Sequence, residues 1–85
     1  MHSIVISQSA LKQLQNLQKP FVKKIGKAIE KLANDPRPIG VKKLQGSNEN
    51  LYRIRVGDYR IVYVIDDGIK LIDIRRNGHR KDIYK

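Results

Sequence analysis

The chain has 85 residues, enough for one domain with one small core. Its 18 Lys and Arg residues against 8 Asp and Glu give a formal net charge of +10, which favours a polyanionic partner (nucleic acid, an anionic membrane or an acidic protein) over a merely soluble basic surface. The absence of cysteine excludes a disulfide framework, a zinc ribbon and a thiol nucleophile, and no apolar run approaches the ~18 residues of a membrane span.

The first half of the sequence predicts a strand followed by two helices. The β-branched run at residues 3–6 is typical of a strand, and Ser7 or Ser9 can cap the helix that follows. Pro20 ends that helix and suits the first turn of the next one, which ends before Pro36. The second helix has a continuous apolar stripe made of Phe21, Val22, Ile25, Ala28, Ile29, Leu32 and Ala33.

The second half predicts an antiparallel meander. Strands are expected at 51–56, 59–65 and 69–76, joined by a two-residue turn at Gly57-Asp58 and a turn at 66–68. A further turn is expected at Asn77-Gly78, before a short tail. The predicted architecture is a single α+β domain over 1–85, with two N-terminal helices packed on a small antiparallel sheet in the order β-α-α-β-β-β.

The turn at Gly57-Asp58 sets the register of the hairpin, with Arg55 opposite Arg60. Because side chains alternate along a strand, one face is predicted to carry the apolar residues and to meet the helices. That register continues into the third strand, where Ile61 is expected opposite Ile74 and Tyr63 opposite Ile72. The apolar set is Tyr52, Ile54, Val56, Tyr59, Ile61, Tyr63, Ile72 and Ile74.

The opposite face of the predicted sheet, which we call the arginine face, carries Arg53, Arg55, Arg60 and Arg75. Like charges directly opposite each other destabilise a hairpin, and only Asp73 offers an acidic partner there. Guanidinium groups bind phosphate bidentately, which favours a phosphate-binding surface. The alternative is a solvated face whose arginines shield Val62 and Val64.

Four other features have a structural and a functional interpretation. His79 is an ordinary surface residue or a proton carrier near neutral pH. Tyr84 packs on the edge of the core or stacks on a base. Lys23, Lys24, Lys27 and Lys31 form a solvated helix face or a contact to nucleic-acid backbone. Asp66-Asp67 indicates a turn, and no spacing of His, Asp or Glu suggests a catalytic metal.

Two segments, LYRIRVGDYRIVY at 51–63 and GHRKDIY at 78–84, resemble the RelE/ParE superfamily of bacterial and archaeal type II toxins, and the lysines of KKLQG at 42–46 fit as well. The resemblance covers the whole chain and is closer to RelE than to ParE. It implies the RelE fold and a ribosome-dependent endoribonuclease that cuts mRNA in the A site. The basic pair on the first meander strand, lysine in familiar members, is Arg53 and Arg55 here.

The resemblance also implies roles for individual residues. Arg55, Arg60 and Arg80 are expected to stabilise the charge that develops when the RNA 2′-OH attacks phosphorus, with no metal or other cofactor. His79 or Tyr84 is expected to move the proton, unless the RNA and the ribosome do so. RNA binding is assigned to four more residues, namely Arg53, Lys43, Arg75 and Lys81.

The expected partners are an acidic cognate antitoxin, the ribosomal A site and mRNA, in the cytoplasm and without a membrane. The free toxin is expected as a monomer that forms a hetero-oligomer with the antitoxin. Two alternatives stay open: a ParE-like inhibitor of DNA gyrase, and a non-catalytic basic module that binds nucleic acid or protein.

Overall fold

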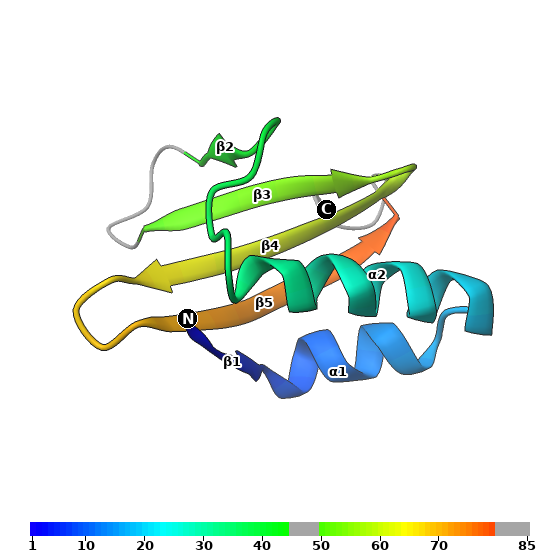
Figure 1. Cartoon of the computed structure of the whole chain (residues 1–85). Coiled ribbons are helices and arrows are strands. Elements are labelled where there is room, and N and C mark those ends of the chain that lie inside the picture. The colour runs from blue at the N-terminus through cyan, green and yellow to red at the C-terminus, as the bar shows by residue number, and fades with distance from the viewer. Residues whose placement is uncertain (45–49, 80–85) are drawn as a thin grey trace.

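The computed structural model describes residues 1–44 and 50–79 as two helices lying on one face of a five-stranded sheet (Figure 1). The strand order is β1-β5-β4-β3-β2. The elements are β1 Ser3–Ile6, α1 Gln8–Gln15, α2 Lys19–Leu32, β2 Lys42–Lys43, β3 Leu51–Val56, β4 Tyr59–Asp66 and β5 Leu71–His79. No helix in these ranges is long and apolar enough to cross a membrane.

The two helices begin where the sequence predicts. Ser7 caps α1, because its hydroxyl accepts a hydrogen bond from the Ala10 amide (3.1 Å) and donates one to the Arg75 carbonyl (3.1 Å). Pro20 lies in the first turn of α2, where its missing N–H costs nothing. The cap of α1 therefore also ties the start of that helix to β5.

The register of the β3–β4 hairpin is as predicted, with Val56 opposite Tyr59 and Arg55 opposite Arg60. Gly57 has a φ of +62°, the left-handed conformation that a glycine adopts without strain at the first position of a two-residue turn. This register directs one row of side chains towards the helices and the other row away from them.

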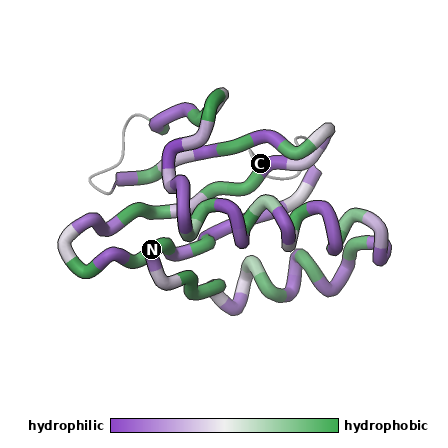
Figure 2. The backbone as a smooth tube through the Cα atoms, viewed as in Figure 1, coloured by the Kyte–Doolittle hydropathy of each residue, from purple (hydrophilic) through white to green (hydrophobic). Residues whose placement is uncertain are grey.

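The core lies between the helices and the apolar face of the sheet. Ile61, Tyr63, Ile72 and Ile74 are fully buried, and Figure 2 shows hydrophobic segments in the central strands and an alternation of polar and apolar segments along the helices. The helices contribute Ala10, Leu14, Ile25, Ile29 and Leu32 to this cluster. The predicted assignment of the apolar face is confirmed.

Two strand pairings were not part of the predicted meander. β1 pairs in parallel with β5, from Ser3 opposite Leu71 to Ile6 opposite Ile74, so the whole sheet is mixed. The two-residue strand β2 pairs with β3 through Lys42 opposite Arg53 and Lys43 opposite Tyr52. The pairing of β1 with β5 joins segments far apart in sequence, whereas β2 and β3 are consecutive along the chain.

The predicted pairing of the last two strands was wrong by two residues at Tyr63 and by three at Ile61. Tyr63 lies opposite Ile74 and Ile61 opposite Asn77, because β4 continues to Asp66 and the register shifts between Val62 and Tyr63. The shift changes which residue of β4 each apolar residue of β5 lies opposite, but these side chains stay on the same face of the sheet. Ile72 and Ile74 therefore still enter the core.

The predicted turn at Asn77-Gly78 was also wrong, because β5 continues through both residues to His79. Asn77 is fully buried; its side chain donates to the Ala10 carbonyl (2.8 Å), and its backbone N–H donates to Gln13 Oε1 (2.8 Å). These bonds to α1 hold an asparagine inside a strand, although the pair Asn-Gly is typical of turns.

Replacement of the capping serine tests the link between α1 and β5. We expect Ser7→Ala to lower the free energy of unfolding by about 0.5–2 kcal/mol, the usual cost of losing an N-cap. Urea denaturation measures the change. Ser9→Ala is the matched control, since Ser9 is exposed and lies inside the helix, and an equal loss in both variants would contradict the assigned cap.

Candidate functional site

The arginine face is built by the hairpin. Arg55 and Arg60 are direct cross-strand neighbours, and Arg53 lies opposite Val62. Their strand neighbours Ile54 and Ile61 belong to the core, so alternation turns the three arginines away from the helices. The shared face predicted for Arg53, Arg55 and Arg60 is confirmed, whereas their chemical roles stay predictions.

The arginines on this face differ in exposure. Arg55 is exposed, whereas Arg53 and Arg60 keep only 7% and 6% of their surface. Arg60 Nη1 donates to the Tyr59 carbonyl (3.3 Å), and its Nε has no hydrogen-bond partner among the described residues. An arginine stays charged at any relevant pH, so Arg60 is a cation with little water and an unused donor. Such a group favours a bound anion.

Strand β5 adds two basic residues beside the hairpin. Arg76 lies opposite Val62, on the arginine face, and is exposed. Arg75 is the extra residue at the register shift, and its Nε donates to Asp73 Oδ2 (2.8 Å). Arg75, which was predicted as part of the site, therefore pairs with Asp73. Arg76 was not predicted there, because simple alternation along the strand would turn its side chain to the other face.

Of the two lysines in β2, Lys42 lies on the arginine face, and the RNA-binding role assigned to Lys43 stays a prediction. Lys42 lies opposite Arg53, while Lys43 lies opposite Tyr52, whose ring belongs to the core side. Cross-strand partners point to the same side of a sheet. The structure therefore brings Lys42 together with the arginines and directs Lys43 to the other side.

His79 lies on the helix side of the sheet. It pairs with Tyr59, and the two rings meet edge to face with centroids 5.9 Å apart. Tyr59 in turn packs on Phe21 of α2 at 4.9 Å. The structure therefore does not bring His79 together with Arg55 and Arg60, because their side chains face opposite sides of the sheet, and the role expected of His79 stays a prediction. The other expected members, Arg80, Lys81 and Tyr84, lie outside the described residues.

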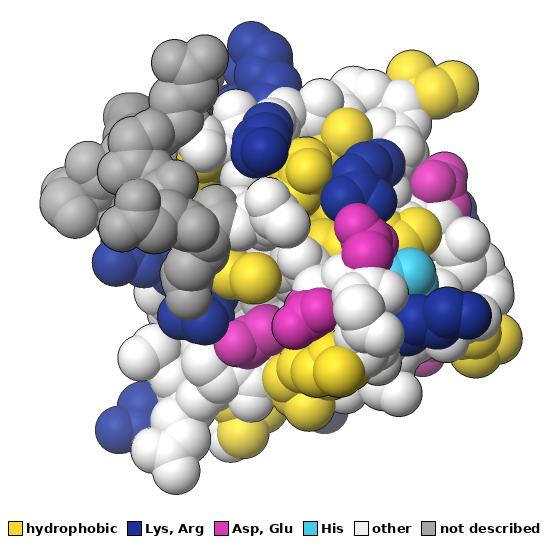
Figure 3. Space-filling model, turned by 90° about the vertical axis from the view of Figure 1, so that its left-hand side faces the viewer, with side chains coloured by type: hydrophobic (Ala, Val, Ile, Leu, Met, Phe, Trp, Pro, Cys, Tyr) yellow, Lys and Arg dark blue, Asp and Glu magenta, His cyan; other side chains and the backbone are white. Residues whose placement is uncertain are grey.

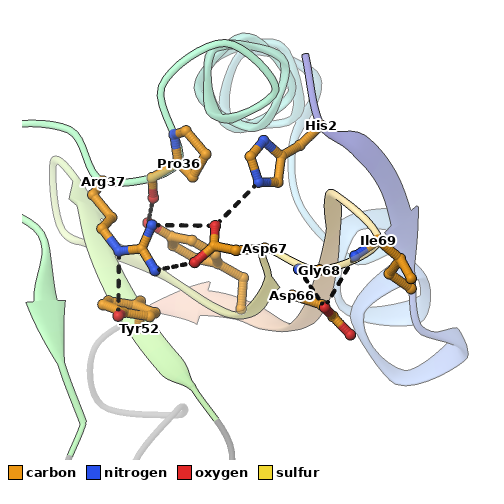
Figure 4. Close-up of polar contacts among 9 residues, drawn as sticks. His2, Pro36, Arg37, Tyr52, Asp66, Asp67, Gly68 and Ile69 are labelled. Atoms are coloured by element: carbon orange, nitrogen blue, oxygen red, sulfur yellow. Dashed lines mark hydrogen bonds and ion pairs between the residues drawn. The ribbon is translucent and has the colours of Figure 1, made fainter.

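A polar cluster that the sequence did not predict lies at the far end of the sheet. Arg37 Nη2 donates to Asp67 Oδ2 (2.9 Å), Arg37 Nε donates to the Tyr52 hydroxyl (3.3 Å), and His2 lies 3.4 Å from Asp67 (Figure 4). Figure 3 looks onto this end, where acidic side chains lie beside a histidine and basic side chains. The cluster fastens the segment after α2 to the β4–β5 turn.

The cluster changes the ionisation of its members. Hydrogen bonding to Arg37, supported by His2, holds the pKa of Asp67 below its ordinary value, and the same contact raises the pKa of Arg37. Burial raises the pKa of Tyr63, whose hydroxyl donates to the Pro36 carbonyl (2.6 Å). These contacts hold the chain after α2 in place.

The described part of the chain has no cluster of His, Asp and Glu able to hold a metal ion.

Comparison with known proteins decides the family. The sequence profile of the ParE toxin of the type II toxin–antitoxin system parDE matches residues 4–84. Toxin RelE of Mycobacterium tuberculosis is 33% identical over 99% of this chain and 87% of its own length, and toxin RelE3 of Methanocaldococcus jannaschii is 33% identical over 95% and 93%. The chain belongs to the RelE/ParE superfamily of type II toxins.

A solved structure agrees with this assignment. The archaeal RelE–RelB complex from Pyrococcus horikoshii contains a chain that matches this superfamily member with a TM-score of 0.83 and 30% identity, over 95% of this chain and 97% of that one. The RelE fold inferred from the sequence is therefore confirmed.

The like-charge pair predicts a gain of stability when it is removed. We expect Arg55→Gln to raise the free energy of unfolding by up to about 1 kcal/mol at low salt, because a direct cross-strand repulsion disappears. Urea denaturation at low and high salt measures the gain, which salt should reduce. Lys43→Gln is the control on a neighbouring strand, and an equal gain there would contradict the repulsion between Arg55 and Arg60.

The polar cluster predicts a pH dependence. The folded-state pKa of Asp67 is lowered, so its contribution to stability is present above the unfolded-state pKa of about 3.9 and is lost as the pH falls through the folded-state value. We expect Arg37→Gln to raise the pKa of Asp67, measured by NMR titration of its carboxyl group. Lys70→Gln is the control, and an unchanged pKa in Arg37→Gln would refute the pairing.

Proposed function

We propose that this chain is the toxin of a type II toxin–antitoxin system and that it cleaves mRNA on translating ribosomes. The observation that carries the proposal is the arginine face, on which Arg55 and Arg60 lie opposite each other and Arg60 is buried with an unused donor. The similarity to proteins named toxin RelE supports the same class.

The proposed chemistry is a transfer within the RNA itself. The 2′-oxygen forms a bond to the adjacent phosphorus and loses its proton, and the bond to the 5′-oxygen breaks as that oxygen gains one. The extra negative charge of the pentacoordinate state is stabilised by the guanidinium groups of Arg55 and Arg60, with Arg53 and Arg76 as cations for flanking phosphates.

The proton carrier is proposed to come from elsewhere than His79. An arginine keeps its proton at any relevant pH, so Arg55 and Arg60 are stabilisers and not bases. His79 faces the helix side of the sheet. The predictions for Arg80 and Tyr84 stand as part of this proposal, with the RNA and the ribosome as the alternative source of the base.

The proposed partner is an antitoxin. The similar structures from Pyrococcus horikoshii and Methanococcus jannaschii, both 30% identical to this chain, are complexes of RelE with RelB. With a net charge of +10, this chain is expected to bind an antitoxin that is acidic where it meets the arginine face.

A second candidate is inhibition of DNA gyrase, favoured by the match to the ParE toxin profile. It predicts DNA breaks and filamentous cells with intact mRNA. The proposed ribonuclease predicts the opposite pattern, with new mRNA 5′ ends inside translated codons and intact DNA.

Induction of the chain and of an Arg60→Gln variant tests the proposal. We expect Arg60→Gln to lower the rate of mRNA cleavage by about 10²–10³-fold, the usual effect of removing one preorganised stabilising group. Mapping of mRNA 5′ ends measures cleavage. Arg55→Gln provides a second, exposed site if the buried substitution disturbs folding, and Lys12→Gln on α1 is the control.

Full cleavage by folded Arg55→Gln and Arg60→Gln would place the reaction away from the arginine face. DNA breaks with intact mRNA on induction of the unaltered chain would instead favour the gyrase inhibitor.

A further inference from the structure

An apolar groove lies beside Arg55. It has a volume of about 570 Å³ and runs between the second half of α2 and the end of β3, with the chain at 34–40 as its other wall. Ala28, Leu32, Ile54 and Val56 line it with apolar side chains, and Ile39 is fully exposed at the rim. Exposed apolar surface of this kind, surrounded by polar residues, is typical of a docking site for another protein.

The edge of β3 is open at the same place. β2 covers β3 only at Tyr52 and Arg53, and Figure 1 shows that the part of β3 nearest the hairpin turn has no strand on its outer side among the described residues. The Leu44 N–H donates to the Leu51 carbonyl (2.8 Å), so Leu51 directs its backbone groups outward. Alternation then directs the N–H and C=O of Arg55 outward as well, where an added strand can pair with them.

The two features require the same kind of occupant. In a strand added to β3, the residue opposite Arg55 lies on the arginine face, while its two neighbours lie opposite Ile54 and Val56, on the side of the groove. Arg55 is exposed and Arg60 lies beside it, which favours a carboxylate opposite them. Lys31 adds positive charge at the rim, and Asp35 lies on the far wall.

We propose that the groove and the open edge of β3 bind an extended segment of an acidic protein with the pattern apolar–acidic–apolar. The two apolar side chains enter the groove, and the acidic side chain pairs with Arg55. This inference rests on the proposed function in one respect: if Arg55 holds RNA phosphate, the same segment blocks RNA binding directly. RNA itself does not fit the groove, because it has no alternating apolar side chains.

A synthetic peptide tests the proposal on the full-length chain. The probe has about ten residues with Leu-Glu-Ile at its centre, and NMR titration of the ¹⁵N-labelled chain measures binding. We expect shifts of the amides at 54–56, and about tenfold weaker binding when the central Glu is replaced by Gln, the effect of one charge-assisted contact. N-methylation of the central peptide N–H should weaken binding by about the same factor, because it removes one main-chain bond.

Ile39→Asp should weaken binding of the peptide about tenfold by placing a charge at the apolar rim. Ile69→Asp is its matched control, since Ile69 is also an exposed isoleucine but lies in the β4–β5 turn, and we expect unchanged binding there. Neither isoleucine belongs to the arginine face, so cleavage of mRNA should be unchanged in both variants.

Absence of shifts at 54–56, or equal binding of the Glu, Gln and N-methylated peptides, would overturn the proposal. Dimerisation of the free chain that Ile39→Asp abolishes, without an effect of the peptide, would assign the groove to a second copy and also overturn it. Peptide binding and mRNA cleavage are measured separately, so failure of the docking proposal is distinguishable from failure of the proposed function.

Discussion

The two-residue turn between β3 and β4 is the constraint on which the rest of the molecule depends. Gly57, with its positive φ, fixes Arg55 opposite Arg60 and Ile54 opposite Ile61. A slip of one residue would move every side chain of a strand to the other face and direct arginines into the core. The turn therefore determines both where the helices pack and where the cations gather.

The stabilisation that the core provides exceeds the repulsion between the arginines. Burial of a side chain such as Ile61 contributes about 1.5–3 kcal/mol, whereas a cross-strand charge pair changes stability by about 0.2–1 kcal/mol. The repulsion between Arg55 and Arg60 is therefore tolerated by a hairpin whose other face is packed against α2. The same alternation explains why an acidic strand added beside β3 would meet Arg55 with its charge and the groove with its apolar residues.

Local patterns were enough to predict the hairpin, because a glycine turn and a period of two determine its register without any distant contact. They were not enough for β5. Asn77 stays inside that strand only because α1 supplies its partners, and this contact joins residues far apart in sequence. The position of His79 on the helix side follows from the same continuation of the strand. Arg37 gave no signal as a lone arginine between prolines, because its partners Tyr52 and Asp67 lie 15 and 30 residues further along the chain.

The central claim is that the arginine face binds RNA phosphate. The most direct measurement is an NMR titration of the arginine Nε–Hε resonances of the full-length chain with a short RNA that carries one 2′-deoxy nucleotide and so is not cleaved. The account predicts shifts for Arg55 and Arg60 and none for Arg37, which lies in the cluster at the far end of the sheet. Shifts of Arg37 with Arg55 and Arg60 unchanged would contradict it.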